Sequence, residues 1–94
     1  MNTNFELLFN LFDKIILEEE TADLTPDHFS RTVAEEYILQ VQKLGSIIPQ
    51  ISYQDLFEEL TLEVIKIFRV KTYGFYDIKS YQKSAIHKLS ESEL

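Results

Sequence analysis

The sequence predicts an all-α fold, a compact bundle of about four helices. Apolar residues recur at the three- and four-residue spacing of amphipathic helices along most of the chain. Start and stop signals divide this pattern into four segments. The 94 residues include only two glycines and two prolines, which argues against a loop-rich or fibrous chain. We therefore expect one helical domain over 1–94, with helices at roughly 3–20, 26–44, 53–70 and 78–90 and a disordered tail at about 90–94.

The first helix, over 3–20, is predicted to start with a capping box. Thr3 and Glu6 have the spacing at which each side chain accepts a hydrogen bond from the other residue's backbone N–H. The apolar residues that follow cover about half of the helix surface: Phe5, Leu7, Leu8, Phe9, Leu11, Phe12, Ile15 and Ile16. A stripe this wide needs neighbours on more than one side. At the acidic run Glu18–Glu20 the helix dipole disfavours negative charge, so we expect fraying or an end there.

The second helix, over 26–44, has clear signals at both ends. Thr25 is a good N-cap, and Pro26 suits the first helical position because its φ angle is already helical. Gly45 suits the left-handed conformation that ends many helices. We therefore expect this helix to run from Pro26 to about Leu44.

The third helix, over 53–70, is predicted to start at Ser52 as N-cap, with Asp55 as its capping-box partner. Ile51 and Leu56 occupy the two positions of a hydrophobic staple around that start. This helix has the most regular apolar spacing, so we expect it to be central, with the first helix packed against it. The fourth helix, over 78–90, is predicted to be capped by Asp77 and has a narrow apolar face.

Charge is distributed unevenly along the chain. The net charge is −7, but residues 1–63 hold thirteen acidic and three basic residues, whereas residues 64–90 hold one acidic and six basic residues. The acidic body and the basic C-terminal segment are therefore complementary surfaces.

Several function classes are disfavoured by what the sequence lacks. Without cysteine, thiolate catalysis, thiolate zinc sites and disulfides are excluded. His28 and His87 do not have the spacing of paired metal ligands, and no glycine-rich loop suits a phosphate. We predict no catalytic residues, no metal and no cofactor. The N-terminal segment lacks the pattern of a signal peptide and its apolar run is too short for a membrane span, so we expect a cytoplasmic protein without membrane contact.

Acidic residues on three predicted helices leave an enzymatic alternative open. They are Glu19, Glu20 and Asp23; Glu35 and Glu36; and Asp55, Glu58, Glu59 and Glu63. Facing one another, such carboxylates would hold Mg²⁺ together with water and substrate phosphates. Small all-α nucleotide pyrophosphohydrolases use paired E-x-x-E and E-x-x-D motifs in this way, but the spacing here differs. The simpler interpretation is that these acids line solvated helix faces.

The basic segment 66–88 leaves a second alternative open. Its bases alternate with aromatic residues, which is the composition of surfaces that bind single-stranded nucleic acid. Nucleic acid is nevertheless disfavoured because the acidic body repels phosphate. A protein contact uses the same residue types.

We therefore expect a small, acidic, non-enzymatic regulatory protein of inhibitor, immunity or adaptor type. It would act through a protein partner, most simply one with a basic surface, because its acidic face would steer association. The candidate partner-binding residues are Glu58, Glu59, Glu63, Tyr73, Phe75, Tyr76, Lys79 and Lys83. The broad apolar stripe of the first helix and the complementary charges also predict a homodimer.

Overall fold

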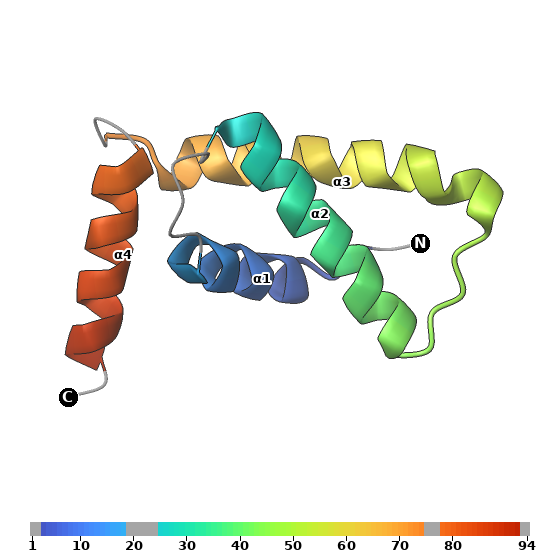
Figure 1. The fold of residues 1–94 in the computed structure, drawn as a ribbon, viewed down its shortest axis with the longest axis horizontal. Coiled ribbons are helices and arrows are strands. Elements are labelled where there is room, and N and C mark those ends of the chain that lie inside the picture. Colours follow the sequence, from blue (N-terminus) through green and yellow to red (C-terminus); the bar gives the residue numbers. More distant parts are fainter. Residues whose placement is uncertain (1–2, 19–24, 75–77, 93–94) are drawn as a thin grey trace.

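The computed structural model describes residues 3–18, 25–74 and 78–92 and confirms the all-α fold. Its four helices are α1 (Phe5–Glu18), α2 (Pro26–Lys43), α3 (Gln50–Lys71) and α4 (Ile78–Ser92), and no strand occurs among the described residues (Figure 1). α4 extends two residues past its predicted end. The disorder predicted for 90–94 stays a prediction, and the capping role of Asp77 and most of the acidic run at 18–20 fall outside the described residues.

The residue that caps α1 is Asn4, and the predicted Thr3–Glu6 capping box is not formed. The Asn4 side-chain oxygen accepts a hydrogen bond from the Leu7 N–H at 3.1 Å, and the Asn4 carbonyl accepts one from the Leu8 N–H. Asparagine is at least as good an N-cap as threonine. A glutamate at position 7 would accept a hydrogen bond from the Asn4 N–H, but Leu7 has no acceptor in its side chain. The Asn4 N–H donates instead to the hydroxyl of Tyr37 on α2, at 2.8 Å.

Both ends of α2 confirm the prediction. The Thr25 hydroxyl accepts a hydrogen bond from the His28 N–H, and Pro26 is the first helical residue. At the other end Gly45 has a φ of +101°. The Ser46 N–H donates to the Val41 carbonyl at 3.0 Å, and the Gly45 N–H to Gln42 at 3.1 Å. This is the Schellman arrangement, which needs a residue that tolerates positive φ, and glycine does so without strain.

The predicted start of α3 is wrong. The helix begins at Gln50, with Pro49 at the capping position and no side-chain cap. Ser52 therefore lies inside the helix, and its N–H bonds to the Pro49 carbonyl. Ile51 is 92% exposed, so it forms no staple with Leu56. The Pro49 carbonyl accepts the Ser52 N–H at 2.9 Å, so the first turn closes on the backbone of Pro49 without a capping side chain.

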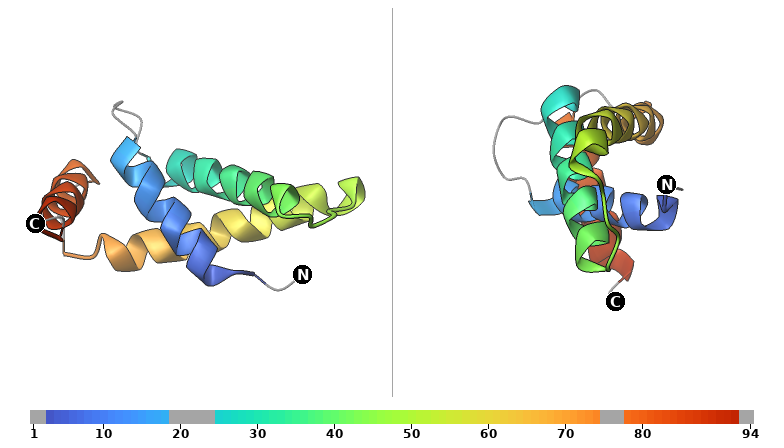
Figure 2. Two further views of the ribbon diagram at one scale, coloured as in Figure 1. Left: turned by 90° about the horizontal axis from the view of Figure 1, so that it is seen from below. Right: turned by 90° about the vertical axis from the view of Figure 1, so that its right-hand side faces the viewer.

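The central helix is α2, which corrects the expectation that the third helix would be central. α2 packs against α3 along most of its length and against α1 on another side. Figure 1 shows α2 passing across both helices, and the left view of Figure 2 shows it alongside α3. Ser30 and Ala34, both fully buried, place small side chains on its packed face, and small residues allow helices to approach closely. The regular apolar spacing of α3 predicts that one face of this helix is buried, but it does not predict which helices pack against that face.

One hydrophobic core joins the first three helices. Its members are Leu8, Leu11, Phe12, Ile15, Ile16, Phe29, Val33, Ala34, Tyr37, Ile38, Val41, Leu60, Val64 and Phe68. At its centre the ring of Phe12 meets that of Phe29 edge-on at 4.8 Å, and both pack against Phe68 at 6.1 and 5.6 Å. Such aromatic contacts add to the burial energy. One aromatic ring from each of α1, α2 and α3 thus contacts the other two at the centre of the core.

α4 joins this core at its edge, beside the C-terminal end of α1. The Gln82 side-chain amide donates to the Ile16 carbonyl at 2.6 Å. The half-buried side chain of Tyr81 packs against the core. In Figure 1, α4 stands at one end of a molecule that measures 41 × 28 × 22 Å. Among the helices of the described ranges, none combines the length and apolar composition needed to cross a bilayer.

Candidate functional site

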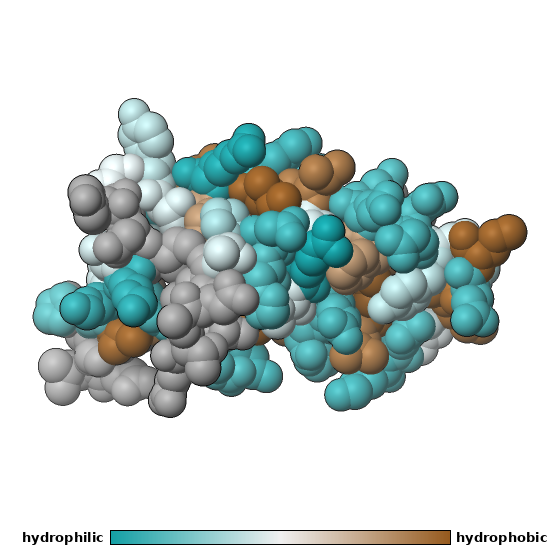
Figure 3. All heavy atoms as spheres, turned by 45° about the horizontal axis from the view of Figure 1, so that its top comes forward, coloured by the Kyte–Doolittle hydropathy of each residue, from teal (hydrophilic) through white to brown (hydrophobic). Residues whose placement is uncertain are grey.

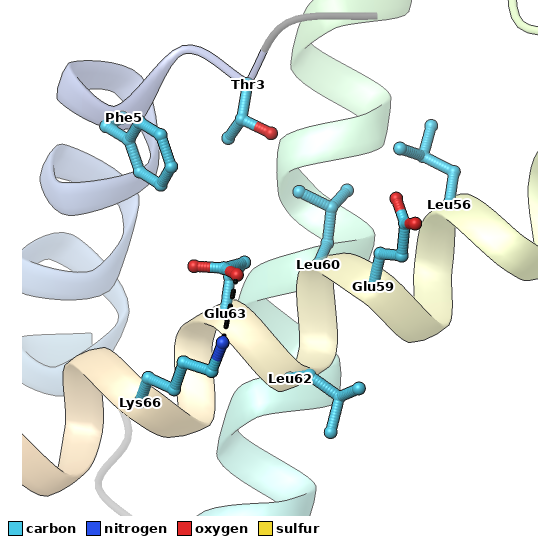
Figure 4. A pocket seen from close by; sticks show the side chains of 8 residues that line it. All are labelled: Thr3, Phe5, Leu56, Glu59, Leu60, Leu62, Glu63 and Lys66. Atoms are coloured by element: carbon cyan, nitrogen blue, oxygen red, sulfur yellow. Dashed lines mark hydrogen bonds and ion pairs between the residues drawn. The ribbon is translucent and has the colours of Figure 1, made fainter.

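A surface hollow of about 320 Å³ lies between the start of α1 and the middle of α3. Its walls are Thr3, Phe5, Leu56, Glu59, Leu60, Leu62, Glu63 and Lys66 (Figure 4). Figure 4 shows Thr3 and Phe5 on the α1 side of the hollow, with Leu60 and Glu63 reaching towards it from α3. The hollow therefore has an apolar part and an acidic edge.

Within the described residues, the ring and ion-pair contacts between α1 and α3 lie at the other end of α1 from this hollow. There, Phe12 packs against Phe68, and the Lys71 ammonium contacts the Asp13 carboxylate at 2.8 Å. The same ammonium lies 5.2 Å from the centre of the Phe12 ring. Two turns earlier, no ring contact or ion pair joins the two helices within the described residues, and Phe5 lines the hollow instead.

Two aromatic side chains of α1 remain half exposed beside this hollow. Phe5 is 47% exposed and Phe9 is 42% exposed, and their ring centres lie 6.2 Å apart. Sequence reasoning placed both in the buried stripe. The width of that stripe indicates the exposure of these two residues. An apolar stripe over half of the helix surface is wider than two neighbouring helices cover, so one edge of it stays exposed. Half-exposed aromatic residues of this kind are typical anchors of protein contacts.

The acidic edge of the hollow comes from two of the predicted site residues. Glu59 is exposed, whereas Glu63 has a side chain that is 37% exposed and pairs with the Lys66 ammonium at 3.4 Å. Two carboxylates and one ammonium leave this edge with a net negative charge. Because the hollow is open to solvent, this charge acts mainly on approaching ions and partners over a Debye length of roughly 8 Å.

The third predicted carboxylate, Glu58, lies on the other side of α3. It accepts a hydrogen bond from the Gln54 amide at 3.2 Å. It lines a second hollow, of about 310 Å³, between α2 and α3, where Arg31 pairs with Asp27 at 3.2 Å. The structure thus brings Glu59 and Glu63 together and separates Glu58 from them.

The aromatic and basic candidates lie elsewhere. Tyr73 is 88% exposed in the turn that follows α3. Lys79 and Lys83 are exposed on α4, at the end of the molecule away from the start of α3 (Figure 1). Phe75 and Tyr76 lie outside the described residues. The predicted site is therefore at least two surfaces, the middle of α3 and the α3–α4 end.

The carboxylates weighed for Mg²⁺ do not gather within the described part of the chain. No group of three or more acidic or histidine side chains with the geometry of a metal site occurs there. Glu36 lies with Lys14 and Glu18 in a third hollow, between α1 and α2. Glu19, Glu20 and Asp23 lie outside the described residues.

Comparison with known proteins gives no further assignment. No family model, no curated protein and no solved structure matches this chain. The case for a function therefore depends on the surfaces of the molecule itself.

Proposed function

We propose that the protein is a non-enzymatic regulatory protein of inhibitor, immunity or adaptor type that binds a protein partner in the hollow between α1 and α3. The observation that carries this proposal is the half-exposed Phe5 beside the carboxylates of Glu59 and Glu63. A partner that fits would place an apolar side chain against Phe5 and a lysine or arginine at the acidic edge.

The two parts of the hollow would act at different stages of binding. Exposed carboxylates attract a basic surface before contact, so they govern the association rate and its salt dependence. Apolar anchors act after encounter and govern dissociation. The proposal places this binding in the cytoplasm, which the cysteine-free sequence fits.

A paired pull-down from the native host tests the proposal. Wild-type protein and the Phe5→Ser variant would be immobilised in equal amounts, and captured proteins identified by mass spectrometry. Leu44→Ser is the matched control, because Leu44 is 77% exposed and lies outside the hollow. We expect a protein that wild type and the control retain and Phe5→Ser loses. Equal capture by all three would contradict the assignment of the hollow.

The charged edge has its own test once the partner is isolated. Neutralising Glu59 and Glu63 to glutamine should slow association and flatten its salt dependence, with little change in dissociation. The matched control is Glu35→Gln, an exposed carboxylate on α2 that does not line the hollow. If the enzymatic alternative held instead, millimolar Mg²⁺ would raise the melting temperature and nucleoside triphosphate would be hydrolysed.

We further propose that the protein forms a homodimer. Phe5, Phe9 and Leu62 leave a large apolar area in water for so small a chain, being 42–60% exposed. Figure 3 shows hydrophobic side chains interrupting the hydrophilic surface at several places along the molecule. Exposed apolar patches of this kind mark contact surfaces in soluble proteins.

A further inference from the structure

The outer face of α3, which points away from the core, carries a row of exposed residues with an ordered charge pattern. Leu62 lies at its middle and is 60% exposed. Asp55 and Glu58 precede it, Lys66 and Arg69 follow it, and all four are exposed. Their spacing places them along one side of the helix. We call these five residues the α3 stripe.

The α3 stripe is complementary to itself when its direction is reversed. Glu58 and Lys66 each lie four residues from Leu62, and Asp55 and Arg69 each lie seven residues from it. A second copy of α3 placed antiparallel, with a twofold axis at Leu62, would therefore set each acid opposite a base. In a parallel arrangement acids would face acids and bases would face bases.

Two very exposed apolar residues extend the same symmetry. Ile51 and Tyr73 each lie eleven residues from Leu62. They are 92% and 88% exposed, respectively. Tyr73 follows the end of α3 by two residues, and its N–H still bonds to the Val70 carbonyl. Ile51 lies in the first turn of α3, and Figure 3 shows hydrophobic side chains at the end of the molecule where α3 begins. An antiparallel partner would cover Ile51 with Tyr73 at both ends of the contact.

We propose that two copies of the chain pair through antiparallel α3 stripes, with the twofold axis at Leu62. This inference rests on the homodimer proposed above and names its surface. A contact related by a twofold axis uses the same patch on both copies, and such a patch must be complementary to itself. The two leucines supply the apolar centre, and the flanking charges select the antiparallel register and disfavour the parallel one.

The existing contacts of the stripe are compatible with this pairing. In the single chain Lys66 pairs with Glu63 at 3.4 Å, but its side chain remains 71% exposed. It can therefore turn to Glu58 of a second copy without unfolding any part of α3. Ile65, half-buried beside Leu62, widens the apolar centre.

The absence of cysteine from the chain makes cross-linking a direct test. Leu62→Cys should give a covalent dimer on mild oxidation at tens of micromolar, because the twofold axis brings the two residues together. The control is Leu44→Cys, at a position that is 77% exposed and outside the stripe. A mixture of Ile51→Cys and Tyr73→Cys should yield the mixed dimer in excess over either self-linked dimer. Predominant Ile51–Ile51 links would overturn the antiparallel register.

Charge reversal tests the complementarity without a chemical linker. A copy with Lys66→Glu and Arg69→Glu should dimerise at least about tenfold more weakly than wild type, because its stripe is acidic throughout. A copy with Asp55→Lys and Glu58→Lys should weaken similarly. Mixing the two variants should restore a dimer, since every position then faces an opposite charge. All four positions are exposed, and circular dichroism would verify the fold.

The outcomes separate this inference from the proposals that precede it. A light-scattering mass near the 11.1 kDa of one chain at tens of micromolar would overturn both the homodimer and its surface. A dimer in which Leu62→Cys links no faster than Leu44→Cys would overturn the α3 stripe alone. Partner capture by the Phe5 hollow has its own test in the pull-down with Phe5→Ser, a position outside the α3 stripe.

Discussion

Removing the hydroxyl of Tyr37 tests how the start of α1 is held. Tyr37 is 1% exposed, and its hydroxyl accepts the Asn4 N–H at 2.8 Å across 33 residues of sequence. Tyr37→Phe keeps the ring in the core and leaves that N–H without its partner. A lost hydrogen bond of this kind costs about 1–2 kcal/mol. In a domain of this size that lowers the melting temperature by about 4–8 °C for each kcal/mol.

Urea unfolding followed by circular dichroism would measure this cost, with Tyr53→Phe as the matched control. Tyr53 is half-buried, stacks on Phe57, and makes no hydrogen bond through its hydroxyl within the described residues. The midpoint should fall by roughly 0.5–1 M urea for Tyr37→Phe and by much less for the control. Amide exchange at Asn4 should accelerate in parallel. Equal effects of the two substitutions would refute the role of the Tyr37 hydroxyl.

Three further predictions concern stability. Thr25→Ala should lower the free energy of unfolding by about 1 kcal/mol, because it removes the α2 cap. Ser52 lies inside α3, so Ser52→Ala should leave the urea midpoint unchanged or slightly higher. Ser30→Ala should stabilise by roughly 0.5–1 kcal/mol, because the fully buried hydroxyl has no hydrogen-bond partner within the described residues; a loss of stability would contradict this. The pKa of the Tyr81 hydroxyl is raised above its ordinary value. Burial is the larger cause, and the nearby Asp13 carboxylate is the smaller one. The unfolded chain therefore loses this proton first, and above pH 10 stability should fall more steeply in wild type than in Tyr81→Phe.

The helix ends show which parts of the fold the sequence can predict. Thr25 and Gly45 act through backbone groups within a few residues, so their roles were predicted correctly. The predicted box at Thr3 failed because the neighbouring Asn4 caps the helix, while its own N–H is held by Tyr37, which is distant in sequence. The predicted cap at Ser52 failed because Pro49 starts the helix three residues earlier. Local rules therefore identify a helix end reliably where one local signal stands alone, as at Thr25 and Gly45, and less so where two signals compete, as at Pro49 and Ser52.

The candidate site was less predictable than the fold. Periodicity placed Phe5 and Phe9 on the same stripe as Phe12, yet only Phe12 is fully buried. The difference arises from where α1 meets α3, and no pattern within α1 encodes that position. Glu58 and Glu59 are exposed and Glu63 is half-buried, and the division of these three acids between two hollows depends on the neighbours of α3.

Leu62 and Lys66 both border the hollow and belong to the α3 stripe, and Lys66 is the charged residue of the two. Its ammonium cannot form ion pairs with Glu63 of its own chain and with Glu58 of a second copy at the same time. A basic partner that pairs with Glu63 would release Lys66 for the second copy, and dimer formation would expose Glu63 to the partner. Two such events favour each other by the same factor in both directions. Partner binding should therefore tighten the dimer, and replacing Lys66 with methionine should remove that coupling while Phe5 continues to hold the partner.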